Sequence, residues 1–325
     1  MKKILVTHNG VFHADEVMAT AVLLNLYGED NVAIVRTSVN KIDKYINDEN
    51  AIIYDIGNGK YNHHNQTIKR NNGIPYSSIG LIWKDFGKDL INKRAILMGI
   101  NDLNIVNRVF NVIDTILIQG IDANDNGYKS PDVKGSINYF TISNMVFTFN
   151  TISYDGGVKN VLKQELNFKK AVDICSQILI ALIRKYIDGA NSEAILQELI
   201  RTRKNKHILV LDKFIPWIGY VTKNTDDIWY VIFPSTREED EWNMQAVPAD
   251  ISTSTSIKVL RHPVPQVWWG KDTKSEVTLA EVTSVEEATF CYKGNGFLTA
   301  AKGLDAILKL ANMAVEEKSN INEMR

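Results

Sequence analysis

Three short apolar runs near the start of the chain, separated by helical patterns, restrict the fold more than any other feature. Residues 3–7 (KILVT) suit a buried strand, and further strands fit residues 32–35 and 51–54. Asp15 and Glu16 open the first intervening helix, where acidic side chains suit the positive end of the helix dipole. The alternation predicts an α/β domain, in which helices cover both faces of a parallel sheet.

The pattern changes along the rest of the chain. Helical periodicity is clearest over three segments: 77–92, 93–110 and 168–187. After a boundary-like segment at 188–206, four strand-like runs and a closing helix follow: 208–211, 229–233, 244–247, 289–292 and 303–317. A chain of 325 residues is long for one core. We therefore expect an α/β domain over residues 1–200 and a smaller α+β domain over residues 205–325.

Composition narrows the class of protein. The formal net charge is −1, whereas a dedicated nucleic-acid binder is expected to be strongly basic. A local basic groove remains compatible with this nearly neutral total. The two cysteines, Cys175 and Cys291, are too few for a fold that depends on disulfide bonds, and they suit a reducing compartment. The apolar run at the N-terminus is short for a signal peptide, and no stretch is apolar enough to span a bilayer. These features predict a cytoplasmic protein with no membrane partner and leave a homo-oligomer open.

Histidines and aspartates gather at the ends of the predicted strands. His8 follows the first strand, and a glycine-containing loop then leads to His13 and Asp15. Asp55 follows the third strand. Because the carboxyl ends of parallel strands form the ligand crevice of an open α/β sheet, these side chains are expected to converge there. Two further segments offer additional candidates, which are His63-His64 and the run that contains Asp122 and Asp125.

This mixture of imidazole and carboxylate groups, without cysteine, favours Mn²⁺, Fe²⁺, Co²⁺ or Mg²⁺ over a structural zinc ion. A single histidine at a strand end is usually an ordinary hydrogen-bonded residue, so the hypothesis depends on the joint pattern. More than four candidate ligands indicate two ions, which can share a carboxylate and a water. Such a pair suits the hydrolysis of phosphate esters, because it activates water and neutralises charge on phosphoryl oxygens.

A second phosphate-binding element is predicted at the start of the helix near residue 77. Ser77 or Ser78 suits the N-cap, and free backbone N–H groups there can hold a phosphate. Arg70 could add a bidentate contact to the same group. Ordinary capping beside a surface arginine explains the pattern equally well, and both interpretations stay open.

Taken together, the motifs resemble the Myg exonuclease family, which belongs to the DHH phosphoesterase superfamily. The resemblance is carried by seven segments and the strand end Asp55-Ile56-Gly57, in the family's order: 7–16 (THNGVFHADE), 61–66 (YNHHNQ), 73–87 (GIPYSSIGLIWKDFG), 121–127 (IDANDNG), 211–217 (LDKFIPW), 261–270 (RHPVPQVWWG) and 290–297 (FCYKGNGF). Any one segment would be weak, whereas the combination is specific.

The resemblance implies a DHH-like catalytic domain that binds two divalent ions, Mn²⁺ or Mg²⁺. The implied ligands are His8, His13, Asp15, Asp55, His63 and one aspartate of the 122–125 run, either Asp122 or Asp125. Asp55 would bridge the ions, and His64 would face the scissile phosphate. The implied activity is 3′–5′ exonucleolytic hydrolysis of RNA or short oligonucleotides, with His64, Arg70 and Asp55 in catalytic roles.

Two positions depart from the family pattern. Asn62 replaces the aspartate of the Asp-His-His motif, and an amide cannot supply the negative charge that orients a ligating histidine. Tyr292 stands near a position that usually carries a histidine. These departures motivate an alternative from another class, a metal-bound protein that holds RNA without turnover. A phosphatase or pyrophosphatase acting on small molecules is the second enzymatic alternative, since the same cluster serves any phosphoryl group.

In the second domain Arg261 is the best candidate for substrate contact, because a guanidinium can clamp a phosphate. A structural arginine beside Pro263 and Pro265 is equally compatible with the sequence.

Overall fold

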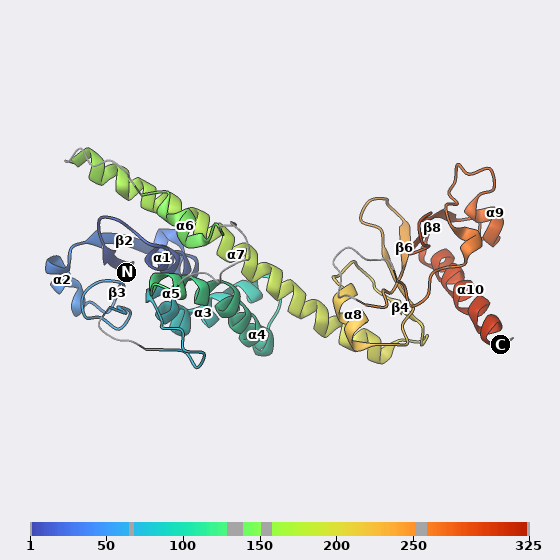
Figure 1. Ribbon diagram of the computed structural model, residues 1–325, viewed down its shortest axis with the longest axis horizontal. Helices are drawn as coiled ribbons and strands as arrows, with labels where there is room; N and C mark the ends of the chain where they lie inside the picture. The colour runs from blue at the N-terminus through green and yellow to red at the C-terminus, as the bar shows by residue number, and fades with distance from the viewer. Residues whose placement is uncertain (1, 65–67, 129–138, 151–157, 251–258, 324–325) are drawn as a thin grey trace. The chain divides into compact units, whose positions relative to one another are not determined.

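The computed structural model describes residues 2–64, 68–128, 139–150, 158–250 and 259–323. The chain forms two compact units, residues 1–190 and 191–325, and each has its own hydrophobic cores. The boundary lies inside one long helix, α7 (Val158–Thr202), whereas the sequence suggested a break near residues 188–206. Asp188-Gly189 resembles a loop, yet the helix continues through both residues (Figure 1).

The first unit is built on a three-stranded parallel sheet in the order β2-β1-β3, as predicted. Its strands are β1 (Lys3–His8), β2 (Val32–Thr37) and β3 (Ala51–Ile53). Side chains alternate between the two faces: Leu5 joins the main core, while Val6 joins a small core with the short helix α2 (Asp43–Ile46). This arrangement confirms the predicted α/β class.

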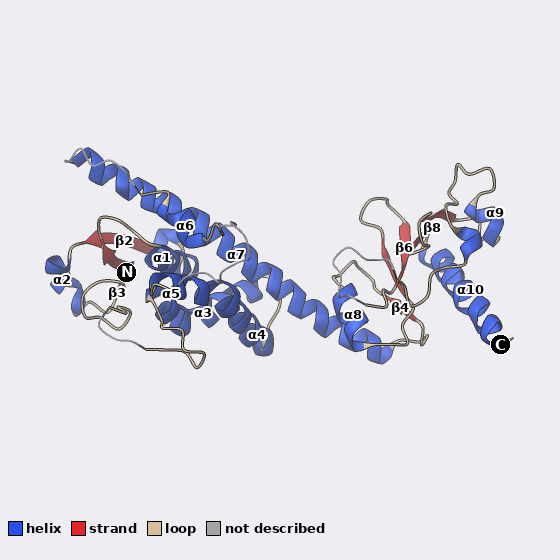
Figure 2. Ribbon diagram, viewed as in Figure 1, coloured by secondary structure: helices blue, strands red, loops and turns tan. Residues whose placement is uncertain are grey.

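Helices form most of the first unit (Figure 2). They are α1 (Ala14–Tyr27), α3 (Ser78–Leu97), α4 (Leu103–Ile113), the π-helical turn η3 (Asp114–Ile118), α5 (Gln119–Asp125) and α6 (Ile142–Phe147). The unit also contains the short helix α2, most of α7 and two 3₁₀ turns, η1 (Glu29–Asn31) and η2 (Val39–Lys41). Helix α1 is the central element: its residues 14–23 are all buried, and it packs against α3, α5 and α6.

The break between α3 and α4 lies later than the sequence suggested. The predicted boundary between residues 92 and 93 falls inside α3, which continues to Leu97. Gly99 then adopts a φ of +75°, which ends the helix at little steric cost. The next helix begins after Asp102, whose side chain accepts a hydrogen bond from the backbone N–H of Asn104. Local capping chemistry therefore decides the boundary rather than hydrophobic periodicity.

The second unit contains a mixed sheet of five strands in the order β4-β5-β6-β8-β7. Its elements are β4 (Ile208–Val210), α8 (Ile218–Asn224), β5 (Tyr230–Pro234), β6 (Glu241–Ala246), η4 (Gln266–Trp268), α9 (Leu279–Thr283), β7 (Ala288–Cys291), β8 (Leu298–Lys302) and α10 (Leu304–Glu323). Strands β4 and β5 pair in parallel, and the other neighbouring strands of this sheet pair antiparallel. The sheet and helices form the expected smaller α+β unit, although strand β8 was not predicted.

Two glycines make the fold testable, because a new Cβ would meet different surroundings at each. Gly189 lies inside α7, where a Cβ would meet no neighbouring group of the described chain within 4 Å, so Gly189→Ala should stabilise the protein by about 0.5–1 kcal/mol. At Gly80 a Cβ would collide with the Asp122 carboxylate and the Tyr76 ring, so Gly80→Ala should destabilise the protein by about 1–3 kcal/mol. Thermal unfolding of both variants tests the assignment, and a lower midpoint for Gly189→Ala would contradict a continuous α7.

Candidate metal centre

The predicted cluster of histidines and carboxylates forms one site at the carboxyl ends of β1 and β3. His8 is the last residue of β1, and His13 lies at the N-cap of α1. Asp55 follows β3 with a φ of +54°, a left-handed conformation that is rare for a residue other than glycine. This bend directs a nearly buried carboxylate into the cluster, which fits the concentration of backbone strain at functional sites.

Asp55 lies between two groups of candidate ligands. Its Oδ2 atom is 3.1 Å from His8 Nε2, while its Oδ1 atom is 3.5 Å from His63 Nε2 and 3.3 Å from His64 Nε2. Ser78 donates a hydrogen bond to Oδ1 over 3.1 Å. One carboxylate therefore faces histidines on both sides, as a group that bridges two ions would.

On the His63 side, three carboxylates approach a single imidazole nitrogen. His63 Nε2 lies 3.0 Å from Asp125 Oδ2, 3.5 Å from Asp55 Oδ1 and 3.9 Å from Asp15 Oδ2. Although it is buried, this nitrogen has no partner with hydrogen-bond geometry in the described part of the chain, and neither has Asp15 Oδ1. Buried polar atoms without partners are costly. Their convergence fits a cation that the surrounding atoms would coordinate.

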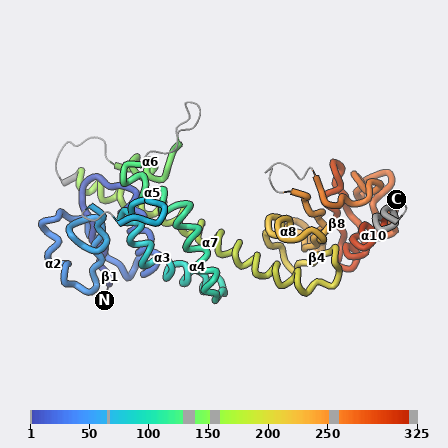
Figure 3. Tube along the Cα trace, turned by 60° about the horizontal axis from the view of Figure 1, so that its bottom comes forward, coloured from blue at the N-terminus to red at the C-terminus, as the bar shows by residue number. Residues whose placement is uncertain are grey.

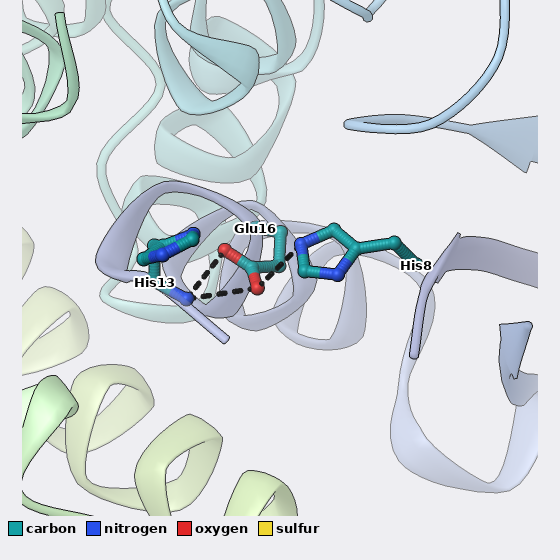
Figure 4. Close-up of side chains that lie close together, drawn as sticks. All are labelled: His8, His13 and Glu16. Carbon is teal, nitrogen blue, oxygen red and sulfur yellow. Dashed lines mark hydrogen bonds and ion pairs between the residues drawn. The ribbon is translucent and has the colours of Figure 1, made fainter. Parts of the chain in front are cut away.

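On the His8 side, Glu16 joins the cluster, and this residue was not among the predicted ligands. Its Oε1 atom lies 3.1 Å from His8 Nε2 and accepts a hydrogen bond from the backbone N–H of His13 over 2.9 Å (Figure 4). Four sets of three ligand atoms lie within 4.8 Å of one another: His8/His13/Glu16, Asp55/His63/His64, His13/Asp15/Asp125 and Asp15/Glu16/Asp55. Glu16 lies in the first turn of α1, where an acidic side chain is expected to interact with the helix dipole. This ordinary role explains why sequence reasoning did not identify Glu16 as a candidate ligand.

The acidity of these groups reflects their crowding. Burial lowers the pKa of His8, but the carboxylates of Asp55 and Glu16 outweigh it and raise the pKa to about 10. Burial likewise lowers the pKa of His63, and Asp125 and Asp55 raise it to about 9. Burial also raises the pKa of Asp15 well above its usual value, reinforced by the negative charge of Asp55. Burial acts in the same direction on Asp55, but the three neighbouring histidines hold its pKa well below the usual range.

Asp122 and Asp125 lie on the same short helix but have different surroundings. Asp125 belongs to the cluster and lines its cavity. Asp122 is fully buried at the start of α3, where its Oδ1 accepts hydrogen bonds from the backbone N–H groups of Ser77 and Gly80 and from the Ser77 hydroxyl. The structure therefore places Asp125 with the candidate ligands and Asp122 as a cap of α3.

Arg70 and Ser77 also lie apart from the cavity. The Arg70 guanidinium forms ion pairs with Asp114 and, at 2.5 Å, with Asp122, and it lies 4.0 Å from the centroid of the Tyr76 ring. Arg70 and Ser77 are therefore engaged in holding α3 and α5 together. Ser78 is also buried and outside the cavity lining, but its hydroxyl donates a hydrogen bond directly to Asp55.

The remaining predicted residues have local structural partners. Arg261, in the second unit, donates to the backbone carbonyls of Thr222, Thr225 and Ile228 around the end of α8. The Asn62 amide donates to the Gly57 carbonyl, and its Oδ1 accepts from the backbone N–H of His64 over 3.4 Å. Asn62 therefore holds the loop that carries His63 and His64 through backbone groups. Tyr292 packs against Phe297 in the second unit, with ring centroids 4.7 Å apart.

The loop between His8 and His13 is held by residues far along the chain. Asn150 accepts a hydrogen bond from the Phe12 N–H over 3.0 Å and donates to the Phe12 carbonyl over 2.8 Å. Gln164 of α7 and Arg36 of β2 both donate to the Gly10 carbonyl, over 3.1 and 2.8 Å. Arg36 in turn pairs with Glu165 of α7 over 2.9 Å. These contacts fix the loop that carries two candidate ligands, and sequence reasoning gave no sign of them.

A cavity of about 1110 Å³ opens over the cluster. Its lining includes the candidate ligands His8, His13, Asp55, His63, His64 and Asp125. The rest of the lining consists of Ala14, Ile56 and residues of α5, the following turn and α6: Asn124, Asn126, Gly127, Ser143, Asn144 and Phe147. Helices α5 and α6 pack against each other, and Figure 3 shows them side by side.

Comparison with known proteins assigns the chain to a family. The model of the MYG1 exonuclease family, described as an uncharacterised protein family (UPF0160), matches residues 4–315. The chain belongs to this family. Relatives along almost the whole length include MYG1 proteins of Schizosaccharomyces pombe, with 27% identity over 97% of this chain and 98% of the relative, and of Dictyostelium discoideum, with 27% identity over 94% of each. The mouse MYG1 exonuclease is 24% identical over 96% of this chain and 84% of its own.

Two solved structures are similar to this MYG1-family chain at 12% identity. A pGpG-specific phosphodiesterase, PggH from Vibrio cholerae, aligns over 97% of this chain and 98% of its own with a TM-score of 0.29. RecJ from Thermus thermophilus, solved with Mg²⁺, aligns over 97% and 50% with a TM-score of 0.24. Among the described residues, no helix is long and apolar enough to cross a membrane.

The different surroundings of Asp122 and Asp125 predict different consequences of the same substitution. Asp125→Asn removes a candidate ligand and should weaken Mn²⁺ binding by about 10-fold or more, with little loss of stability. Asp122→Asn leaves Arg70 with one carboxylate instead of two and should cost about 3 kcal/mol of stability. Calorimetric titration with Mn²⁺ and denaturant unfolding separate the two effects. An unchanged Mn²⁺ affinity in Asp125→Asn would remove Asp125 from the site.

Protons and metal ions should compete for this site. With pKa values of about 10 for His8 and about 9 for His63, both imidazoles carry protons at neutral pH until a cation displaces them. Mn²⁺ affinity should therefore rise with pH between about 6 and 9, and binding should release protons. Titration calorimetry in two buffers of different ionisation enthalpy measures that release. A constant affinity without proton release would show that these imidazoles are not ligands.

Proposed function

We propose that this chain is a phosphoesterase that uses divalent metal ions to hydrolyse phosphodiester bonds, removing nucleotides from the 3′ end of RNA. The observation that carries the proposal is the position of Asp55, whose two oxygens face His8 on one side and His63 and His64 on the other. The names of the mouse, rat and human relatives, MYG1 exonuclease, support the same class of reaction.

The donor set suits two ions, Mn²⁺ or Mg²⁺, because it consists of imidazoles and carboxylates without thiolates. His8, His13 and Glu16 would hold one ion, and Asp15, His63 and Asp125 would hold the other, with Asp55 shared. When bound, such ions lower the pKa of a coordinated water and neutralise the charge that grows on phosphoryl oxygens.

The chain's own groups would orient the substrate. The His64 side chain is 62% exposed, lines the cavity and lies 3.3 Å from Asp55. It is therefore placed to donate a proton to a phosphoryl or leaving oxygen. Ser78, at the start of α3, holds both carboxylates in place. Its hydroxyl donates to Asp55 over 3.1 Å, and its backbone N–H donates to Asp15 over 3.3 Å. We assign Arg70 a positioning role through Asp122 and Asp114 rather than a contact with the phosphate.

Digestion of 5′-labelled and 3′-labelled RNA with Mn²⁺ tests the proposal. A 3′–5′ exonuclease shortens the 5′-labelled strand stepwise and releases a single labelled nucleotide from the 3′-labelled strand. Asp55→Ala should lower the rate by about 10³-fold or more, since the activated water and the charge neutralisation contribute several kcal/mol. Asp173→Ala, which removes an exposed carboxylate from α7, is the matched control and should leave the rate unchanged.

Other products identify the alternatives. Internal fragments would indicate an endonuclease, and phosphate release from nucleotides or pyrophosphate but not from RNA would indicate a small-molecule phosphatase. RNA binding without any cleavage would favour the non-catalytic alternative. Each of these results contradicts the proposed exonuclease.

A further inference from the structure

The cavity over the metal centre is larger than the chemistry of one phosphate requires. Its volume of about 1110 Å³ is large enough for a whole organic ligand, since small-molecule sites have roughly 300–1,000 Å³. The candidate metal ligands account for only part of the lining. Besides Ala14 and Ile56, which lie beside candidate ligands, the lining includes residues around the end of α5 and in α6 that neither the proposed reaction nor the sequence motifs explain: Asn124, Asn126, Gly127, Ser143, Asn144 and Phe147.

No lysine or arginine occurs among the described residues that line this cavity. Sites for pyrophosphate or nucleoside triphosphates neutralise several phosphates, and basic side chains commonly contribute to that neutralisation. Here the positive charge would come from bound ions and from the histidines of the cluster. The lining therefore suits a substrate that presents one phosphate to the metal centre and uncharged groups to the rest of the cavity.

Phe147 supplies an exposed aromatic surface in this otherwise polar part of the lining. Its exposed fraction is 61%, although it belongs to a helix whose neighbouring residue Val146 is fully buried in the main core. Val146 thus anchors α6, and Phe147 is not needed for packing. Ser143, Asn144 and Phe147 are spaced so that one face of the helix presents all three to the cavity. Exposed rings in such positions are typical platforms for nucleobases.

The neighbours of Phe147 can form hydrogen bonds without carrying charge. Asn144 Oδ1 is occupied by the Thr141 N–H and hydroxyl, at 3.0 and 2.8 Å. Its amide nitrogen donates to no described residue and can serve a ligand. The hydroxyl of Ser143 is likewise without a partner in the described part of the chain. An aromatic face beside an amide and a hydroxyl matches the chemistry of a base and its sugar.

We propose that Phe147 stacks on the base of the nucleotide that is removed, and that α6 thereby makes the enzyme select a terminus that carries a base. This inference rests on the proposed function, since it places the scissile phosphate at the metal centre. It adds that the substrate is recognised as a single nucleotide unit, by stacking and neutral hydrogen bonds, and not by its phosphate charge alone.

The test compares two RNA oligonucleotides that differ only at the 3′-terminal nucleotide, one with a base and one with an abasic ribose analogue. Wild type should show a higher kcat/KM for the terminus with a base, by about 5- to 150-fold, the range expected when one base stacks on an aromatic ring. Phe147→Ala should lose this preference while hydrolysing the abasic oligonucleotide at the wild-type rate. Phe147→Trp should retain the preference.

Phe140→Ala is the matched control, because Phe140 is 72% exposed but does not line the cavity. Equal losses on both oligonucleotides in Phe147→Ala, or no loss on either, would overturn the proposal.

If wild type hydrolyses neither oligonucleotide, the proposed exonuclease fails, and a binding measurement then tests the inference separately. Calorimetry of the Mn²⁺-loaded protein should show tighter binding of adenosine 5′-monophosphate than of ribose 5-phosphate in wild type but not in Phe147→Ala. Equal affinities in wild type would refute stacking by Phe147.

Discussion

The mutual repulsion of three buried carboxylates is the constraint on which the first unit depends. Asp15, Glu16 and Asp55 are almost completely shielded from water, and they have oxygen atoms within 4.8 Å of one another. Such a group is stable only when positive charge lies beside it or when one carboxyl takes up a proton, which the raised pKa of Asp15 favours. In the metal-free protein the protonated imidazoles of His8 and His63 supply that charge. The site therefore combines buried carboxylates with positively charged groups before any ligand is present.

A second layer of contacts keeps these carboxylates from moving apart. The start of α3 provides donors to Asp15 and Asp55 through Ser78, while Asp122 caps the same helix and pairs with Arg70. Gly80 permits this approach, since any side chain there would collide with Asp122. Arg70, Ser77 and Ser78, for which the sequence left phosphate binding and ordinary capping open, thus divide between support of the candidate metal site and the packing of α3 against α5.

The sequence predicted the elements that depend on simple periodicity. Alternating strands and helices indicated the parallel sheet, and the rule that ligands gather at strand ends brought His8, Asp15, Asp55 and His63 together. It did not predict the break after Leu97 or the continuation of α7 through Gly189, because capping and tertiary packing decide them. Glu16 fitted an ordinary role at a helix start, and the sequence could not decide between Asp122 and Asp125 as the candidate ligand. The actual partners of Glu16 and Asp122 became visible only in the folded structure, where segments distant in sequence meet.

The anchoring of the loop that carries His8 and His13 has a consequence for the order in which the molecule can mature. Asn150 holds Phe12, and Gln164 and Glu165 hold Gly10, directly and through Arg36. Because synthesis proceeds from the N-terminus, a nascent chain that already contains every candidate ligand still lacks these three residues. The start of α7 must therefore be synthesised before His8 and His13 can reach their final positions.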